Sequence, residues 1–343
     1  MDRKDFARAL STGTVPSVLL FEGEEEHLKQ EALAQLRAAV LPAGMEALNE
    51  TVLEDPETDR LIADAETQPF MSERRLVVIR DLPCLTGRAE ADEKLISWLP
   101  SVPDTTILHF YCTGKPDGRK KLYSAVRKLD GIVTFSPLRG AELVRFVTDA
   151  FKESGKECDE RTAEYLIFTV GDDAGLLRTE IRKLASYAGD RPSVIASDVT
   201  SLATPSTECT VFQMVDAVVT GQKSRALTLL RNQLLSGTDR MTILAMLLRQ
   251  YRLLQHIKIM QYEKRGGDYI RAALGVPSFA VDQYLRQASG YTGGQVKNAV
   301  RICFDTEYAV KSGRIQQEGA VESVVIRLLT LKEMQQELAE KQR

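Results

Sequence analysis

Residues 15–33 read VPSVLLFEGEEEHLKQEAL, an apolar run followed by an acidic turn and a helical pattern. The run at 15–21 predicts a short strand, which the charged, glycine-containing segment EGEEE ends. From Glu24 onward the apolar residues recur at helical spacing, at Leu28, Ala32, Leu33, Leu36 and Val40. The stretch therefore predicts a strand, a turn and an amphipathic helix, which together open an α/β domain.

The same alternation of strand and helix patterns continues beyond this stretch. ALNETVLE at 47–54 predicts a strand, TDRLIADAE at 58–66 a helix, and RRLVVIRDL at 74–82 a strand buried on both faces. Further helix and strand patterns lead to GIVTF at 131–135. Alternating strands and helices imply right-handed crossovers and a mainly parallel sheet. The sequence therefore predicts an α/β domain, a parallel sheet with flanking helices, over residues 1–138.

The pattern becomes helical after Ser136 and Pro137. AELVRFVTDAFKESG, TAEYLIFTVG and DAGLLRTEIRKLASYAG each show apolar residues at helical spacing, and no strand pattern separates them. The polar segment TPSTE at 204–208 breaks this series, and helical patterns then continue nearly to Arg343. We expect two all-α domains, over residues 139–207 and 208–343.

The apolar run at 241–262 contains Arg249, Arg252 and Lys258, which exclude a membrane-spanning helix. Its wide apolar face predicts burial in the core of a helical bundle. A subunit interface is the alternative, because patterning does not separate the two. The large apolar residues of this face are Leu244, Leu247, Leu248, Tyr251, Leu254 and Ile257.

Composition limits the class of protein. Of the 343 residues, 43% are hydrophobic and 27% are charged, which is typical of globular domains and not of disordered chains. The net charge of −3 argues against coating of nucleic acid by bulk electrostatic attraction. The opening MDRKDFARALSTG lacks the apolar core of a signal peptide, and no stretch approaches the about 20 apolar residues that cross a bilayer. We expect no membrane attachment.

The sequence offers no pattern for catalysis or metal binding. The five cysteines form no C-x-x-C pair, so neither a zinc ribbon nor a disulfide framework is indicated, and we expect a reducing, cytoplasmic location. His27, His109 and His256 have no partners at ligand spacing. We therefore expect no catalytic residue, no metal site and no cofactor.

The turn after Phe21 is where a nucleotide-binding loop would lie in such a domain. A Walker A loop needs G-x-x-x-x-G-K-[ST], because its glycines expose backbone amides to phosphate, its lysine neutralises charge and its hydroxyl holds magnesium. Here Gly23 is followed by three glutamates, which would repel a triphosphate. No G-x-G-x-x-G fingerprint replaces it. We expect no nucleotide site in this chain.

In order along the chain, these segments resemble those of the delta subunit family of bacterial DNA polymerase III. The resemblance covers nearly the whole length. The segments that carry it are LLFEGEEEHLKQEAL (19–33), TQPFMSERRLVVIRDLP (67–83), RKKLYSAVRKLDGIVTFSPLRGAELVRFV (119–147), GDDAGLLRTEIRKLASYAGD (171–190), VFQMVDAVVTG (211–221), RQYRLLQHIK (249–258) and YAVKSGRI (308–315).

The resemblance implies an AAA+ type fold of three domains: an α/β domain over 1–138, a helical lid over 139–207 and a helical collar over 208–343. It implies a subunit without ATPase activity of its own that binds and opens the sliding clamp, the beta subunit, in DNA replication. ATPase partner subunits, joined with a delta-prime type subunit through the collar, would then load the clamp on primed DNA. An active AAA+ ATPase motor subunit of a clamp loader and a helical scaffold unrelated to replication are the alternatives.

By the same resemblance, the clamp contact matches TQPFMSERR, in which Phe70 is the aromatic anchor. Pro69 stands where some members have leucine, so Met71 is the second anchor or the register shifts by one. Two large apolar side chains in a polar, proline-marked turn need a binding partner or a place in the core. Folding of Phe70 back onto its own domain is therefore the alternative to clamp binding.

A basic group, Arg119, Lys120 and Lys121, precedes the strand pattern at 131–135. It is a candidate contact for a DNA backbone or an acidic partner. An ordinary solvated helix is the favoured interpretation, because the group has no interleaved aromatic residues.

Overall fold

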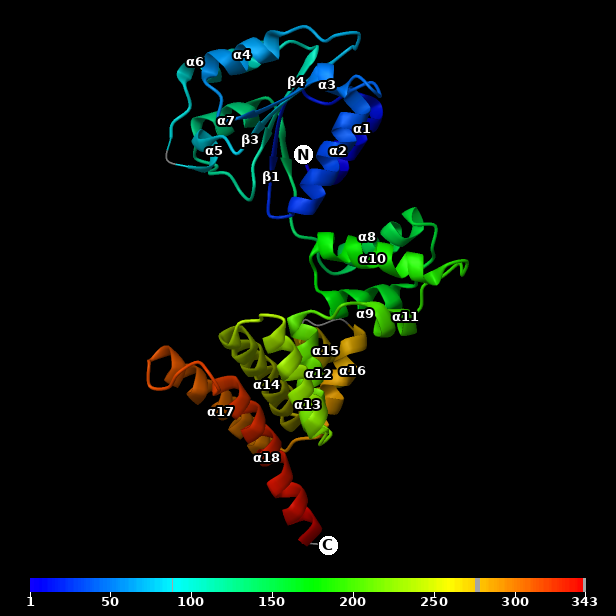
Figure 1. Cartoon of the computed structure of the whole chain (residues 1–343), viewed down its shortest axis with the longest axis vertical. Helices are drawn as coiled ribbons and strands as arrows, with labels where there is room; N and C mark the ends of the chain where they lie inside the picture. Colours follow the sequence, from blue (N-terminus) through cyan, green and yellow to red (C-terminus); the bar gives the residue numbers. More distant parts are fainter. Residues whose placement is uncertain (88, 275–277, 342–343) are drawn as a thin grey trace. The chain divides into compact units, whose positions relative to one another are not determined.

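The computed structural model describes residues 1–87, 89–274 and 278–341. The chain divides into two compact units, Met1–Leu138 and Arg139–Arg343 (Figure 1). The first combines a sheet with helices, and the second is helical. The fold class predicted from the sequence is confirmed. Division into three domains stays a prediction.

A five-stranded sheet with the order β2-β3-β4-β1-β5 organises the first unit. All its paired strands run parallel. From β1 the chain crosses to the edge strand β2, returns through β3 to β4 beside β1, and then places β5 on the other side of β1. The strands are β1 (Val18–Glu22), β2 (Glu50–Glu54), β3 (Arg75–Arg80), β4 (Thr106–Tyr111) and β5 (Ile132–Thr134).

Helices cover both faces of this sheet. Figure 1 shows α1 and α2 on one face and α4 to α7 on the other. The helices of this unit are α1 (Arg3–Thr12), α2 (Glu26–Val40), α3 (Glu46–Asn49), α4 (Thr58–Glu66), α5 (Pro83–Thr86), α6 (Glu93–Trp98), the 3₁₀ turn η1 (Leu99–Ser101) and α7 (Lys121–Lys128). This three-layer arrangement is the AAA+ type of domain that the resemblance implied.

The predicted elements agree with the observed ones within a few residues. In β3 the apolar residues from Leu76 to Ile79 are completely buried, as expected for a strand covered on both faces. The strand predicted at 47–54 begins only at Glu50, because 46–49 forms the single helical turn α3. The helix predicted from Glu24 begins at Glu26.

The second unit is built from helices, and those from residue 207 onward share one apolar core. The residues of the 241–262 run that were predicted to be buried lie in that core, on α14. No helix in the described ranges is both long and apolar enough to cross a membrane. The helices are α8 (Ala141–Glu153), α9 (Glu160–Val170), α10 (Ala174–Ala188), α11 (Ala196–Leu202), α12 (Thr207–Val219), α13 (Lys223–Leu235), α14 (Arg240–Tyr262), α15 (Gly267–Leu274), α16 (Ser278–Ser289), α17 (Gly293–Lys311) and α18 (Ala320–Lys341).

A buried histidine lies at the centre of the sheet. His109 on β4 is fully inaccessible, and neither of its ring nitrogens has a hydrogen-bond partner among the described residues. The Phe21 ring lies edge-on to it at 4.2 Å between centroids. Burial, together with the positive charges of Arg37 and Arg80, lowers the pKa of His109 from 6.5 to about 3. The imidazole is therefore neutral in the folded protein.

This burial predicts a loss of stability in acid. In the unfolded chain His109 takes up a proton near its ordinary pKa of 6.5, whereas in the fold the pKa is about 3. The stability that the neutral, buried His109 gives is fully present above pH 6.5. Below this pH the free energy of unfolding falls by up to about 1.4 kcal/mol per pH unit, because the unfolded chain binds the proton. His109→Phe should remove this component. Urea unfolding of both proteins between about pH 7 and pH 5 measures the difference in slope, and equal slopes would contradict the prediction.

Candidate functional site

The carboxyl ends of β1 and β4 form the switch point of the sheet. The connection after β1 runs through α2 on one face, and the connection after β4 runs through α7 on the other (Figure 1). Open parallel sheets bind ligands in the crevice at such a point, because the adjacent loops diverge there. The turn after Phe21 lies at this crevice, so its geometry decides whether a nucleotide has room.

Gly23 is required there for packing against the backbone. Its φ is +116°, a conformation that favours glycine, and an added Cβ would lie 2.1 Å from the carbonyl oxygen of Phe135. Its amide donates to the Gly114 carbonyl at 3.2 Å. This amide is therefore already bonded within the fold, and it is not available to a phosphate group.

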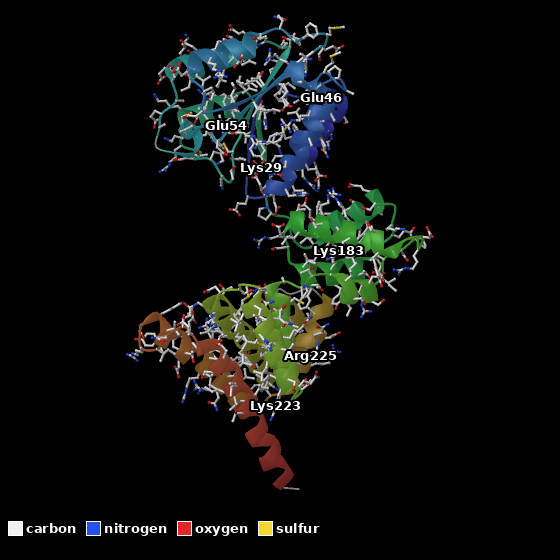
Figure 2. The ribbon with its side chains drawn as sticks, viewed as in Figure 1. Lys29, Glu46, Glu54, Lys183, Lys223 and Arg225 are labelled. Atoms are coloured by element: carbon white, nitrogen blue, oxygen red, sulfur yellow. The ribbon has the colours of Figure 1, made fainter. Side chains whose placement is uncertain are left out.

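The crevice contains a buried lysine. Lys29 reaches from α2 to the end of β4, where its Nζ donates to the carbonyl oxygen of Cys112 at 2.6 Å (Figure 2). Its side chain is 0% exposed and forms an ion pair of 2.9 Å with Glu26. The Tyr111 hydroxyl also donates to Glu26. Burial alone raises the pKa of Glu26, but the bonds from Tyr111 and Lys29 outweigh it and lower the pKa overall.

Sequence reasoning missed Lys29. It stands six residues after Gly23, which is the lysine position of the Walker A spacing, while Leu28 occupies the position of the second glycine and Gln30 that of the hydroxyl. Counting from Gly23 would have found it. The lysine is retained, but its charge is taken up by Glu26 and by backbone carbonyls. A phosphate would meet no free cation at this lysine.

The turn between α4 and β3 lies at the opposite, amino-terminal edge of the sheet. Phe70 is 55% exposed and Met71 is 76% exposed, while Pro69 is half-buried. Met71 has a φ of +50°, which is uncommon for a residue with a bulky side chain. The structure thus places Phe70 outside the core, and the alternative in which it folds back onto its own domain is not the one observed.

Buried polar side chains hold this turn, although sequence reasoning did not single them out. Arg75, which is 5% exposed, donates to the Thr67 carbonyl at 3.2 Å and to the Thr51 hydroxyl at 2.8 Å. Asn49, which is fully buried, bonds the backbone of Phe70. Polar residues of this kind have no hydrophobic pattern, so only their contacts reveal them.

The basic group before β5 forms ion pairs within the unit. Arg119 bonds Asp117 at 2.8 Å, Lys120 bonds Glu90 at 3.2 Å, and Lys121 pairs with Glu93. Lys120 has a side chain that is only 12% exposed. These pairs reduce the net positive charge that the group offers to a DNA backbone, and a contact with DNA stays a prediction.

These features define a protein with an α/β domain of the AAA+ type, in which the buried Lys29 is paired with Glu26 and bonded to the Cys112 carbonyl. Two family models match the chain: "DNA polymerase III, delta subunit" over residues 19–135 and "DNA polymerase III delta subunit, C-terminal domain" over residues 208–328. The chain belongs to the DNA polymerase III delta subunit family. By that membership it is a component of the DNA polymerase III complex.

Individual relatives agree with this assignment. The chain is 28% identical over 334 residues to "DNA polymerase III subunit delta" of Bacillus subtilis (strain 168), covering 95% of this chain and 96% of that protein. It is 26% identical over 266 residues to "Probable DNA polymerase III subunit delta" of Aquifex aeolicus (strain VF5), covering 74% of each. The solved Bacillus subtilis DNA clamp loader delta protein matches with a TM-score of 0.56 and 26% identity, over 95% of this chain and 99% of that one.

The buried position of Lys29 predicts a structural role. Lys29→Met should lower the free energy of unfolding by about 2 kcal/mol, because charged hydrogen bonds to buried carbonyls are lost and Glu26 loses its partner. Lys128→Met, at an exposed lysine of α7, should change stability by no more than about 0.5 kcal/mol. Chemical unfolding compares the two variants. A Lys29 variant as stable as the parent would show that the buried ammonium contributes nothing.

Proposed function

We propose that this chain binds and opens the sliding clamp, the beta subunit, through the turn at residues 69–71. ATPase partner subunits then load the clamp on primed DNA. One observation carries the proposal: Phe70 and Met71 are exposed, 55% and 76%, on a turn whose backbone is held by buried groups. Bulky apolar side chains presented in this way are suited to a hydrophobic pocket on a partner.

The exposed fractions of the three side chains in the turn indicate which of them are the anchors. Pro69 is half-buried, whereas Phe70 and Met71 extend further into solvent. This supports Phe70 and Met71 as the pair that enters the clamp, with Pro69 restricting the backbone before them. A turn that is already ordered loses less entropy on docking.

The bonded groups at the crevice support a role in which this chain does not itself hydrolyse ATP. Lys29 and Glu26 neutralise each other, and the Gly23 amide is bonded internally. Such a subunit needs partners that hydrolyse ATP on its behalf. We therefore propose that the chain acts by binding the clamp and has no catalytic site of its own.

The helical region at 208–343 is the proposed collar, which joins the ATPase subunits and a delta-prime type subunit. Large apolar residues are exposed on its helices and on the segment between α17 and α18, as expected for surfaces that assembly covers. We propose a cytoplasmic location, with primed DNA reached through the complex. The exposed residues in question are Leu227, Leu235, Ile259, Tyr262, Tyr269, Phe304, Tyr308, Ile315 and Ile326.

The clamp contact predicts a selective effect of one truncation. Phe70→Ala should weaken binding to the sliding clamp of the same organism about thirtyfold, the equivalent of about 2 kcal/mol for a buried aromatic anchor. Folding stability should hardly change, because the side chain is already 55% exposed. Titration against the clamp and thermal unfolding measure the two quantities.

Leu176→Ala is the matched control, since Leu176 is 57% exposed on α10, outside the proposed contact. It should leave clamp affinity unchanged. Met71→Ala tests the register and should weaken binding if Met71 is the second anchor. Unchanged affinity in both the Phe70 and the Met71 variants would exclude the turn as the contact.

The alternative function, an active AAA+ ATPase motor, differs in nucleotide binding. We expect no ATP binding by the isolated chain at micromolar concentrations, because the crevice offers carboxylates and a neutralised lysine. Isothermal calorimetry with magnesium and ATP provides the test, and an ATPase subunit of the same assembly serves as positive control. Micromolar affinity would favour the motor instead.

A further inference from the structure

Asn49 makes three hydrogen bonds, two to the turn and one to Met45, the residue that precedes its own helix. Its Oδ1 accepts the Phe70 amide at 2.7 Å, and its Nδ2 donates to the Phe70 carbonyl at 3.0 Å. The same Nδ2 donates to the Met45 carbonyl at 3.2 Å. Both N–H groups of the side-chain amide and one lone pair of its oxygen are therefore used.

The position of Asn49 makes these bonds strong and rigid. The residue is 0% exposed and lies at the end of α3, next to the first residue of β2. Water does not compete for buried hydrogen bonds, and an unpaired buried amide is costly. Phe70 is 21 residues away in the sequence, so this contact joins the turn to the helix that leads into β2.

Asn49 bonds the one residue whose side chain is the proposed aromatic anchor. With the amide and carbonyl of Phe70 both fixed, the direction of its Cα–Cβ bond is fixed as well. Arg75 holds the start of the turn, where its guanidinium donates to the Thr67 carbonyl and not to Phe70. The bonds from Asn49 are thus placed where they orient the side chain that projects into solvent.

We infer that Asn49 is a positioning residue for partner binding, because its two bonds to the Phe70 backbone preorganise that side chain for the hydrophobic pocket of the clamp. The inference rests on the proposed function. Asparagine is specifically suited to this role, since aspartate lacks the donor and leucine lacks both groups. A turn that is already ordered loses less conformational entropy when it binds.

Local order of the turn is measured without any clamp. In Asn49→Ala, hydrogen–deuterium exchange of the backbone amides at 70–72 should accelerate by roughly tenfold, because the acceptor for the Phe70 amide is lost. Ile79→Val, which perturbs the buried β3 strand of the same unit, should leave exchange of the turn unchanged. Exchange as slow as in the parent would overturn the inference.

A double-mutant cycle against the clamp separates positioning from general stability. Asn49→Ala should weaken clamp binding by roughly tenfold in the parent chain. In the Phe70→Ala background it should have almost no further effect, since the side chain it orients is gone. An additive loss in the double variant, or unchanged affinity in the single one, would overturn the inference. Ile79→Val should not alter affinity in either background.

The cycle also distinguishes failure of this inference from failure of the proposed clamp contact. Phe70→Ala without any loss of clamp affinity overturns the clamp contact itself, and the role of Asn49 with it. Loss of affinity in Phe70→Ala together with none in Asn49→Ala overturns only the positioning role. Should Asn49→Ala fail to fold, Asn49→Leu fills the buried position and removes both the donor and the acceptor, and the same outcomes apply to it.

Discussion

The hydrogen bond from the buried Lys29 ammonium to the Cys112 carbonyl is the contact on which the arrangement of the sheet's switch point depends. It joins α2 to the end of β4 at the switch point of the sheet, where a parallel α/β domain usually holds its ligand. An ammonium bonded in this way needs a counter-ion, and Glu26 supplies it. The domain therefore combines the architecture of a nucleotide-binding fold with a lysine at the switch point that is bonded to its own residues.

The two edges of the sheet consequently have different roles. At the carboxyl edge, Gly23 packs against the backbone of Phe135, and the buried Lys29 is paired with Glu26. At the amino edge, the turn before β3 presents Phe70 and Met71 to solvent on a backbone held by Arg75 and Asn49. A surface of this kind requires a rigid support more than a cavity, and a sheet buried on both faces provides one.

Periodicity was sufficient to predict the layers of the fold, because the apolar runs that form β1 and β3 contain little else. It was insufficient for local departures. The residues 46–49 continue the strand-like alternation of ETVLE but form a helical turn, whose last residue, Asn49, bonds a backbone 21 residues away. Lys29 likewise appeared to be an ordinary helix residue, since its burial depends on carbonyls more than 80 residues later. Long-range polar contacts leave no periodic trace in the sequence.

The edge position of β2 has a consequence for how the protein behaves among its own copies. An edge strand exposes unpaired backbone groups, to which a strand of another molecule can add. Val52 at the middle of β2 is 48% exposed, so its side chain offers no barrier to such pairing. Glu50 and Glu54 flank it at both ends of the strand. Glu50 is ion-paired with Arg37 at 2.7 Å, whereas Glu54 is exposed, so the charge at the carboxyl end of the strand is what opposes the addition of another copy to this edge.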